Sequence, residues 1–164
     1  MNDKAVVFFS RDGSTRIAAN IIAEKIGAEL IELQEEKPNR NFLMSGFRAS
    51  TRKHAALSGD PWAEIASCNT LILGAPIWAG KGIPAMNGFL DKIDLSGKHV
   101  YLFTLQADPN LRSSGQVIAH YTRRVEDAGG TVDGSIALPG NSPGKTGSEK
   151  DIRTTLEKWS LFNN

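Results

Sequence analysis

The sequence Ser10-Arg11-Asp12-Gly13-Ser14-Thr15 joins an apolar run, residues 5–9, to an amphipathic run, residues 17–26. This order predicts a strand, a tight polar loop and a helix. Gly13 allows the backbone to turn where a Cβ atom would clash. The first N–H groups of a helix have no partner within the helix, and the helix dipole is positive there, so such a loop favours an anion, usually a phosphate. The alternative is an ordinary strand-to-helix turn with a Ser or Thr cap.

Apolar segments and helical segments then alternate along the chain. We expect strands near residues 4–9, 29–33, 70–73, 100–105 and 131–138, and helices near 17–26, 61–67, 84–93, 114–128 and 148–162. This alternation indicates a parallel sheet with helices on both faces, a doubly wound α/β fold. We expect a single domain, 1–164, in which residues 34–60 form a long connection with a short helix near 42–49.

Composition excludes several classes of protein. The 164 residues carry a formal net charge of +1, whereas a nucleic-acid-binding domain would be strongly basic. Cys68 is the only cysteine, which excludes an internal disulfide and fits a reducing compartment. No histidine lies near it in the sequence, so we expect a buried apolar residue rather than a nucleophile. Because there is no signal-peptide pattern and no apolar run of roughly 20 residues, we expect a soluble, cytoplasmic protein without a membrane span.

Three loops are predicted to meet at one edge of the sheet. In a doubly wound sheet, ligands bind beyond the carboxyl ends of the strands, where the strand order reverses. The loops after the first, third and fourth strands, residues 10–15, 76–82 and 105–112, all lie at that edge. They contribute an anion cradle, a tryptophan and a set of polar groups, so we expect a binding site there. The three histidines have no ligand spacing, and we predict neither a metal site nor a catalytic residue.

With these loops in view, the chain resembles the flavodoxin-like family, which binds flavin mononucleotide (FMN). The 10–15 loop is similar to the family's Ser/Thr-x-Thr-Gly-x-Thr phosphate loop, and Gly74-Ala75-Pro76-Ile77-Trp78-Ala79-Gly80 is similar to the segment after the third strand. The resemblance implies a five-stranded sheet of order 2-1-3-4-5, a three-layer architecture and FMN as the cofactor. It covers nearly the whole chain.

The resemblance also implies which residues hold the cofactor. The phosphate would lie on the 10–15 loop, Trp78 would cover one face of the flavin, and polar groups after the fourth strand would bond its pyrimidine edge. A core tryptophan is the alternative for Trp78. The residues expected to contact FMN are Ser10, Arg11, Asp12, Gly13, Ser14, Thr15, Pro76, Ile77, Trp78, Ala79, Gly80, Gln106, Asp108 and Asn110. Asp12 replaces the family's Thr and places a carboxylate near the phosphate, which weakens binding unless Arg11, Arg16 or backbone amides compensate.

Three functions follow from this interpretation. The first is an FMN protein that transfers electrons between redox partner proteins. The second is an FMN-dependent NAD(P)H:quinone or porphyrinogen oxidoreductase, which the near-neutral charge favours because electron-carrier flavodoxins are strongly acidic. The third is a flavin-free anion-binding module, which Asp12 and the lack of a tyrosine after the fourth strand favour. We expect a monomer or homodimer that works with redox partner proteins or a small-molecule electron acceptor, without nucleic acid.

Overall fold

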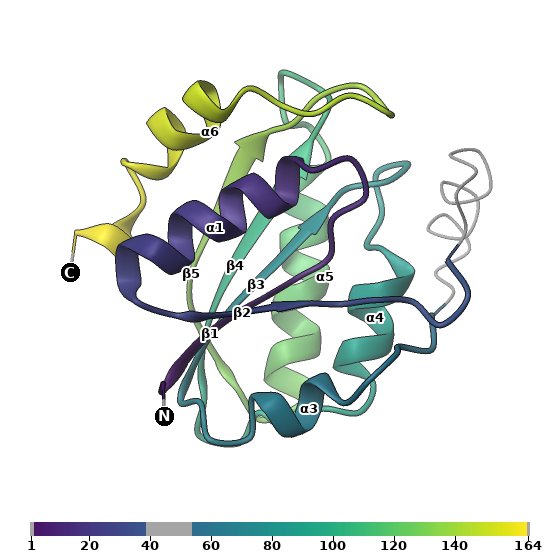
Figure 1. Cartoon of the computed structure of the whole chain (residues 1–164), viewed down its shortest axis with the longest axis vertical. Coiled ribbons are helices and arrows are strands. Elements are labelled where there is room, and N and C mark those ends of the chain that lie inside the picture. The colour runs from purple at the N-terminus through teal and green to yellow at the C-terminus, as the bar shows by residue number, and fades with distance from the viewer. Residues whose placement is uncertain (1, 39–53, 164) are drawn as a thin grey trace.

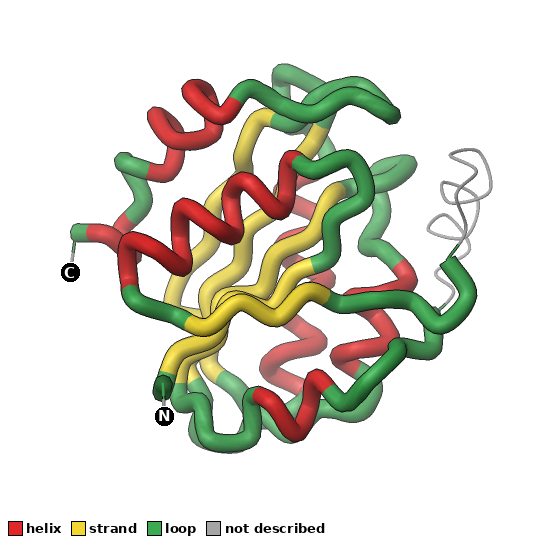
Figure 2. The backbone as a smooth tube through the Cα atoms, viewed as in Figure 1, coloured by secondary structure: helices red, strands yellow, loops and turns green. Residues whose placement is uncertain are grey.

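The computed structural model describes residues 2–38 and 54–163, so the short helix expected near 42–49 lies outside the described residues. Five parallel strands form one sheet in the order β2-β1-β3-β4-β5, as the resemblance predicts (Figures 1 and 2). The strands are β1 (Lys4–Phe8), β2 (Glu29–Glu32), β3 (Thr70–Pro76), β4 (His99–Gln106) and β5 (Thr131–Pro139). The chain leaves β1 for β2 on one side and then crosses to β3 on the other, so the order reverses between β1 and β3.

Helices cover both faces of this sheet (Figure 1). One face carries α1 (Ser14–Ile26) and α6 (Glu149–Leu156), and the other carries α3 (Pro61–Glu64), α4 (Pro84–Leu90) and α5 (Ser114–Asp127). A short 3-10 helix, Ser160–Phe162, ends the described chain. No helix in the described segments is long and apolar enough to cross a membrane.

The core has one half on each face of the sheet. Strand β1 is buried on consecutive positions because Val6 packs under α1 while Val7 packs toward α4 and α5. Gly74 in β3 allows the Phe103 ring of β4 to lie directly against the β3 backbone, since a Cβ atom on Gly74 would lie 1.9 Å from Cζ of Phe103. The edge strand β2 leaves Leu30 45% exposed, in keeping with its mixed apolar and charged sequence.

Several strands and helices end at other residues than the sequence predicts. Strand β3 runs three residues further than expected, because Gly74, Ala75 and Pro76 pair with Phe103, Thr104 and Leu105 of β4. Helices α3 and α4 end at Glu64 and Leu90, earlier than predicted. The N-cap of α3 is as expected, since the Asp60 carboxylate accepts a hydrogen bond from the Ala63 N–H at 3.0 Å.

The last helix is the largest of these errors. The sequence predicts one helix over 148–162, but α6 ends at Leu156 and Trp159 has an extended conformation. The spacing of Ile152, Leu156 and Trp159 correctly predicts that all three are buried. The Trp159 ring packs edge-on against Tyr101 and Phe162, and the chain leaves the helix to place it there.

Candidate functional site

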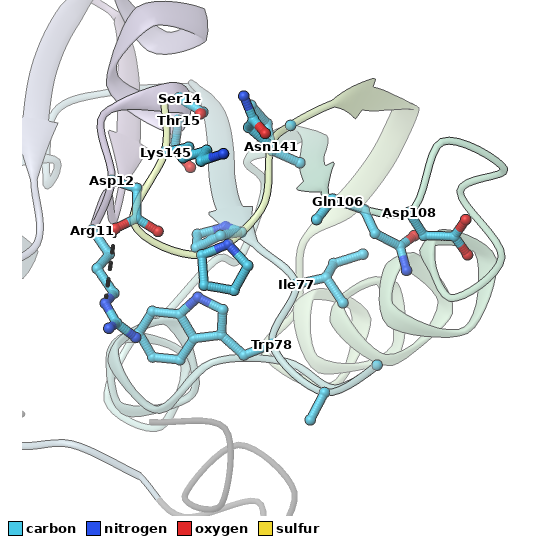
Figure 3. A pocket seen from close by; sticks show the side chains of 17 residues that line it. Arg11, Asp12, Ser14, Thr15, Ile77, Trp78, Gln106, Asp108, Asn141 and Lys145 are labelled. Carbon is cyan, nitrogen blue, oxygen red and sulfur yellow. Dashed lines mark ion pairs between the residues drawn. The ribbon is translucent and has the colours of Figure 1, made fainter. Parts of the chain in front are cut away.

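A cavity of about 300 Å³ lies at the carboxyl edge of the sheet, beside the point where the strand order reverses (Figure 3). Four loops form it, those that follow β1, β3, β4 and β5. Its volume is at the lower end of the range for small-molecule sites, about 300–1,000 Å³. The lining residues are Arg11, Asp12, Ser14, Thr15, Pro76, Ile77, Trp78, Ala79, Gly80, Leu105, Gln106, Ala107, Asp108, Gly140, Asn141, Pro143 and Lys145.

The loop after β1 is arranged to receive an anion. Gly13 has φ +95°, and its carbonyl accepts the first bond of α1 from Ile17 N–H at 3.0 Å. The Ser10 hydroxyl accepts from the Arg16 N–H at 3.2 Å and braces the loop from within. The backbone N–H groups of residues 13–15 donate to no protein group within the described part of the chain. Of these residues, Ser14 and Thr15 line the cavity, so the start of α1 presents N–H groups and the positive end of the helix dipole there.

The loop after β5, residues 140–147, is the part of the site that sequence reasoning missed. The Thr146 hydroxyl donates to the Asp12 carbonyl at 2.6 Å, and the Gly147 N–H donates to the Ser14 hydroxyl at 2.7 Å. These two bonds tie the loop to the 10–15 loop. They place Lys145 in the cavity wall, where no described carboxylate lies within ion-pair distance of it. The signal available in the sequence was a lysine-containing polar loop that also follows a strand at this edge.

Trp78 belongs both to the core and to the cavity wall. Its side chain is only 8% exposed, and its ring packs edge-on against Phe9 with 5.6 Å between centroids. The Arg11 guanidinium lies 5.6 Å from the centroid of the same ring (Figure 3), a cation–π contact. The structure therefore confirms the core alternative for Trp78 and also places its ring in the cavity wall, while its stacking on a flavin stays a prediction.

A tight turn follows Trp78 and forms the next part of the wall. The Lys81 N–H donates to the Trp78 carbonyl at 2.9 Å. Ala79 and Gly80 between them have φ +49° and +69°, so both central residues are left-handed, as in a type I′ turn. Glycine adopts this backbone readily, whereas Ala79 holds it at some strain.

The loop after β4 supplies one oriented amide and one neutralised carboxylate. The Gln106 side chain is 9% exposed, and its Oε1 accepts from the Ser114 hydroxyl at 3.1 Å, which leaves its NH₂ group for a ligand. Asp108 accepts from Arg112 Nε at 2.6 Å and from the Asn110 N–H at 3.0 Å. The bond from Arg112, with that from Asn110, lowers the pKa of Asp108 below its ordinary value. Asp108 is therefore ionised but already paired.

The cavity brings together all of the expected contact residues except Ser10, Gly13 and Asn110. Those three shape their loops instead, through the Ser10–Arg16 bond, the left-handed turn at Gly13 and the Asn110–Asp108 bond. The lining residues that the sequence did not predict are Leu105, Ala107, Gly140, Asn141, Pro143 and Lys145.

No protein-family model matches the sequence, and no curated protein matches it. Solved structures do match. A "putative flavoprotein" from Bacteroides uniformis superposes with a TM-score of 0.75 at 21% identity, over 95% of this chain and 98% of that one. The fold is flavodoxin-like. A flavoprotein in complex with FMN from Lactobacillus acidophilus gives 0.64 at 17% identity, over 98% and 99% of the two chains. Oxidised Flavodoxin 2 from Bacillus cereus gives 0.63 at 17% identity, over 99% and 98%.

Proposed function

We propose that this flavodoxin-like protein binds FMN in the cavity and transfers electrons between redox partners. The observation that carries the proposal is the meeting of two features in one cavity: the unpartnered N–H groups at the start of α1 and the Trp78 ring. They meet where the strand order reverses, which is where flavodoxins hold FMN. The structurally similar protein from Lactobacillus acidophilus was solved with FMN.

The residues present fit the phosphate end of FMN. The N–H groups of Ser14 and Thr15, which line the cavity, would donate to phosphate oxygens. The Ser14 hydroxyl accepts from Gly147 and keeps its own proton to donate, while the Thr15 hydroxyl lies in the same wall. Lys145 would supply positive charge from the opposite loop, and this cation offsets the Asp12 carboxylate that departs from the family's loop.

The residues on the β3 and β4 side fit a flat ring. Trp78, Ile77 and Pro76 would form an apolar wall for it, and the Gln106 amide would bond its polar edge. When bound, FMN supplies the redox chemistry, while the protein orients it and sets the charge around it. Ala79 and Gly80, whose φ angles are positive, line the cavity beside this wall.

The oxidoreductase alternative is favoured by one observation of its own. A second, smaller cavity adjoins the first at Gly80, which offers room for part of a small substrate. The net charge of +1 is also unlike the acidic surface by which carrier flavodoxins dock to basic partners. The cytoplasmic location and the monomeric or homodimeric state stay predictions.

Parallel titrations with FMN, riboflavin and inorganic phosphate test the proposal. FMN should bind the apoprotein about a hundredfold more tightly than riboflavin, since only FMN occupies the phosphate loop. Quenching of flavin fluorescence measures both affinities. Equal affinities would contradict the role of the 10–15 loop, and phosphate binding without flavin binding would establish the flavin-free alternative. Addition of NADH or NADPH to the loaded protein, followed at the flavin absorption band, then separates an oxidoreductase from a carrier.

A further inference from the structure

A second cavity, of about 90 Å³, lies on the other side of the turn that follows Trp78. Its walls are residues 80–82, Asn87 of α4, and Gln116, Val117 and His120 of α5. Helices α4 and α5 lie on the same face of the sheet (Figure 1). Gly80 lines both cavities, so the second cavity adjoins the proposed flavin site at this residue of the turn.

Two residues that line this cavity carry side-chain donors with no acceptor in the described part of the chain. The Asn87 side chain is only 2% exposed, and its Oδ1 lies 3.1 Å from His120 Nε2. The NH₂ group of Asn87 has no acceptor among residues 2–38 and 54–163. Lys81 is half-buried, and no described carboxylate lies within ion-pair distance of its ammonium group. Both residues line the cavity, so an anion bound there could accept a hydrogen bond from the Asn87 amide and pair with the Lys81 ammonium group.

The cavity is built into the fold rather than left by loose packing. Gln116 Nε2 donates to the Gly80 carbonyl at 2.8 Å and fixes the turn to α5. The buried Tyr121 hydroxyl accepts from the Ile83 N–H at 3.0 Å and fixes the chain just beyond it. A Cβ atom on Gly82 would lie 3.0 Å from that hydroxyl and 3.2 Å from Cδ2 of His120. Glycine at this position therefore allows the close approach that shapes the cavity.

We propose that this second cavity binds the carboxylate of a small-molecule redox substrate. The inference rests on the proposed function, because it takes FMN in the first cavity as the group with which the substrate exchanges electrons. The second cavity is smaller than the roughly 150 Å³ of a cavity that holds benzene. It therefore admits only the acid group of the substrate, which Lys81 and the Asn87 amide would hold. The rest of the substrate would lie outside, beside Gly80.

A purely structural role explains only part of this arrangement. One turn further along the same two helices, Arg124 Nη2 contacts Asp91 Oδ1 at 2.6 Å, so Asn87 with His120 could be a second link between α4 and α5. That role accounts for the Oδ1 atom of Asn87. It accounts neither for the unpartnered NH₂ group nor for Lys81, and both line the cavity.

Titration with a matched pair of ligands tests the proposal. Oxidised, FMN-loaded protein is titrated with 2-naphthoate and with 2-naphthamide, which share their rings and differ in charge, in low-salt buffer free of carboxylates. Calorimetry should show about tenfold tighter binding of 2-naphthoate. Lys81→Met and Asn87→Asp should each abolish most of that preference and leave 2-naphthamide unchanged. Lys158→Met, at an exposed lysine beyond α6, is the matched control and should keep it.

Nuclear magnetic resonance gives a readout that does not depend on the flavin. The ¹⁵N-labelled side-chain amide of Asn87 should shift with 2-naphthoate and not with 2-naphthamide, in loaded protein and apoprotein alike. Equal affinities in FMN-loaded protein, with an unmoved Asn87 signal, would overturn the inference and leave the proposed function intact. Failure of FMN to bind would instead refute the proposed function, and the apoprotein spectra would still decide whether the cavity takes a carboxylate. Near-UV circular dichroism confirms that each variant is folded.

Discussion

The two edges of the sheet use their polar groups differently. At the amino edge, the N–H groups of Asn69 and Thr70 both donate to the Asp3 carbonyl, at 2.8 and 3.1 Å. The His99 N–H donates to the Asn69 carbonyl at 2.8 Å, and Lys98 Nζ donates to the Cys68 carbonyl at 2.6 Å. Each loop at this edge is closed by bonds to its neighbours.

The carboxyl edge holds donors that no other residue in the described part of the chain accepts from. The N–H groups of residues 13–15 have no acceptor in the described chain, and Lys81 and Lys145 have no ion-pair partner there. The start of a helix with no cap for its N–H groups, together with two lysines that have no described ion pair, makes this edge favourable for an anionic ligand. Substitutions at the amino edge should therefore lower stability, and substitutions at the carboxyl edge should lower ligand affinity.

Trp78 is the expected exception, because its substitution should lower both stability and ligand affinity. Its truncation should have the largest effect of the variants proposed here. The side chain is buried against Phe9 and also lines the cavity. Trp78→Ala should lower the free energy of unfolding of the apoprotein by about 3 kcal/mol, because a large buried ring is lost. It should also weaken FMN binding. Urea unfolding of the apoprotein and an FMN titration measure the two effects, and unchanged stability would mean that the ring does not contribute to the core.

Substitution of Lys145, at the carboxyl edge, should lower ligand affinity without lowering stability. Lys145→Met removes an exposed cation that lines the cavity, so it should weaken FMN binding about tenfold while riboflavin binding and stability stay unchanged. The loss should shrink as salt is added, since exposed charges are screened. An equal loss for riboflavin would show that Lys145 contacts the ring rather than the phosphate. Lys150→Met, at an exposed lysine in α6, is the control.

Substitution of Lys98, at the amino edge, should lower stability without changing ligand affinity. Its ammonium group donates to the carbonyls of Ala66 at 3.2 Å and Cys68 at 2.6 Å. Lys98→Met should lower the free energy of unfolding by about 1 kcal/mol, the usual contribution of such a bond. FMN affinity should not change. Thermal unfolding of the apoprotein measures the first quantity, and a change in FMN affinity would contradict the separation of the two edges.

The sequence predicted those parts of the molecule that depend on local pattern. Consecutive apolar residues indicate buried strands, and the polar loop before an amphipathic run indicates the helix N-terminus, so the strands and the 10–15 loop were recognised. Strand order came from the resemblance to flavodoxins, and the structure confirms it. The burial of Cys68 was also predicted correctly, and burial raises the pKa of its thiol, in keeping with an inert residue.

The features that were missed depend on contacts between distant residues. The bond from Thr146 to the Asp12 carbonyl joins residues 134 positions apart, and no local pattern shows that Lys145 returns to the first loop. The end of α6 depends in the same way on Trp159 meeting Tyr101 from β4. The second cavity needs Asn87 and His120 to face each other from different helices. Periodicity assigns residues to faces, but only the packed structure shows which faces meet.

Asp12 gives the smallest expected effect and the finest test of the carboxyl edge. Its carboxylate lines the cavity beside the unpartnered N–H groups, so it should repel a phosphate there. Arg11 reduces this repulsion only partly, because its Nε lies 3.9 Å from Asp12 Oδ1 while its guanidinium lies over the Trp78 ring. The bond from Thr146 uses the Asp12 carbonyl and not its side chain, so the loop should keep its shape when the carboxylate is changed.

Asp12→Asn removes the charge and keeps the size of the side chain. FMN binding should tighten about threefold at low salt, and the gain should disappear at high salt, as expected for partly exposed charges. Riboflavin binding should stay unchanged, because riboflavin has no phosphate to be repelled. Fluorescence titrations at two salt concentrations measure the four affinities of each protein, the variant and the unsubstituted chain. Weaker FMN binding by Asp12→Asn would mean that the carboxylate acts by holding Arg11 in place over Trp78, and the Asp12 that departs from the family's loop would then be a positioning residue of the site.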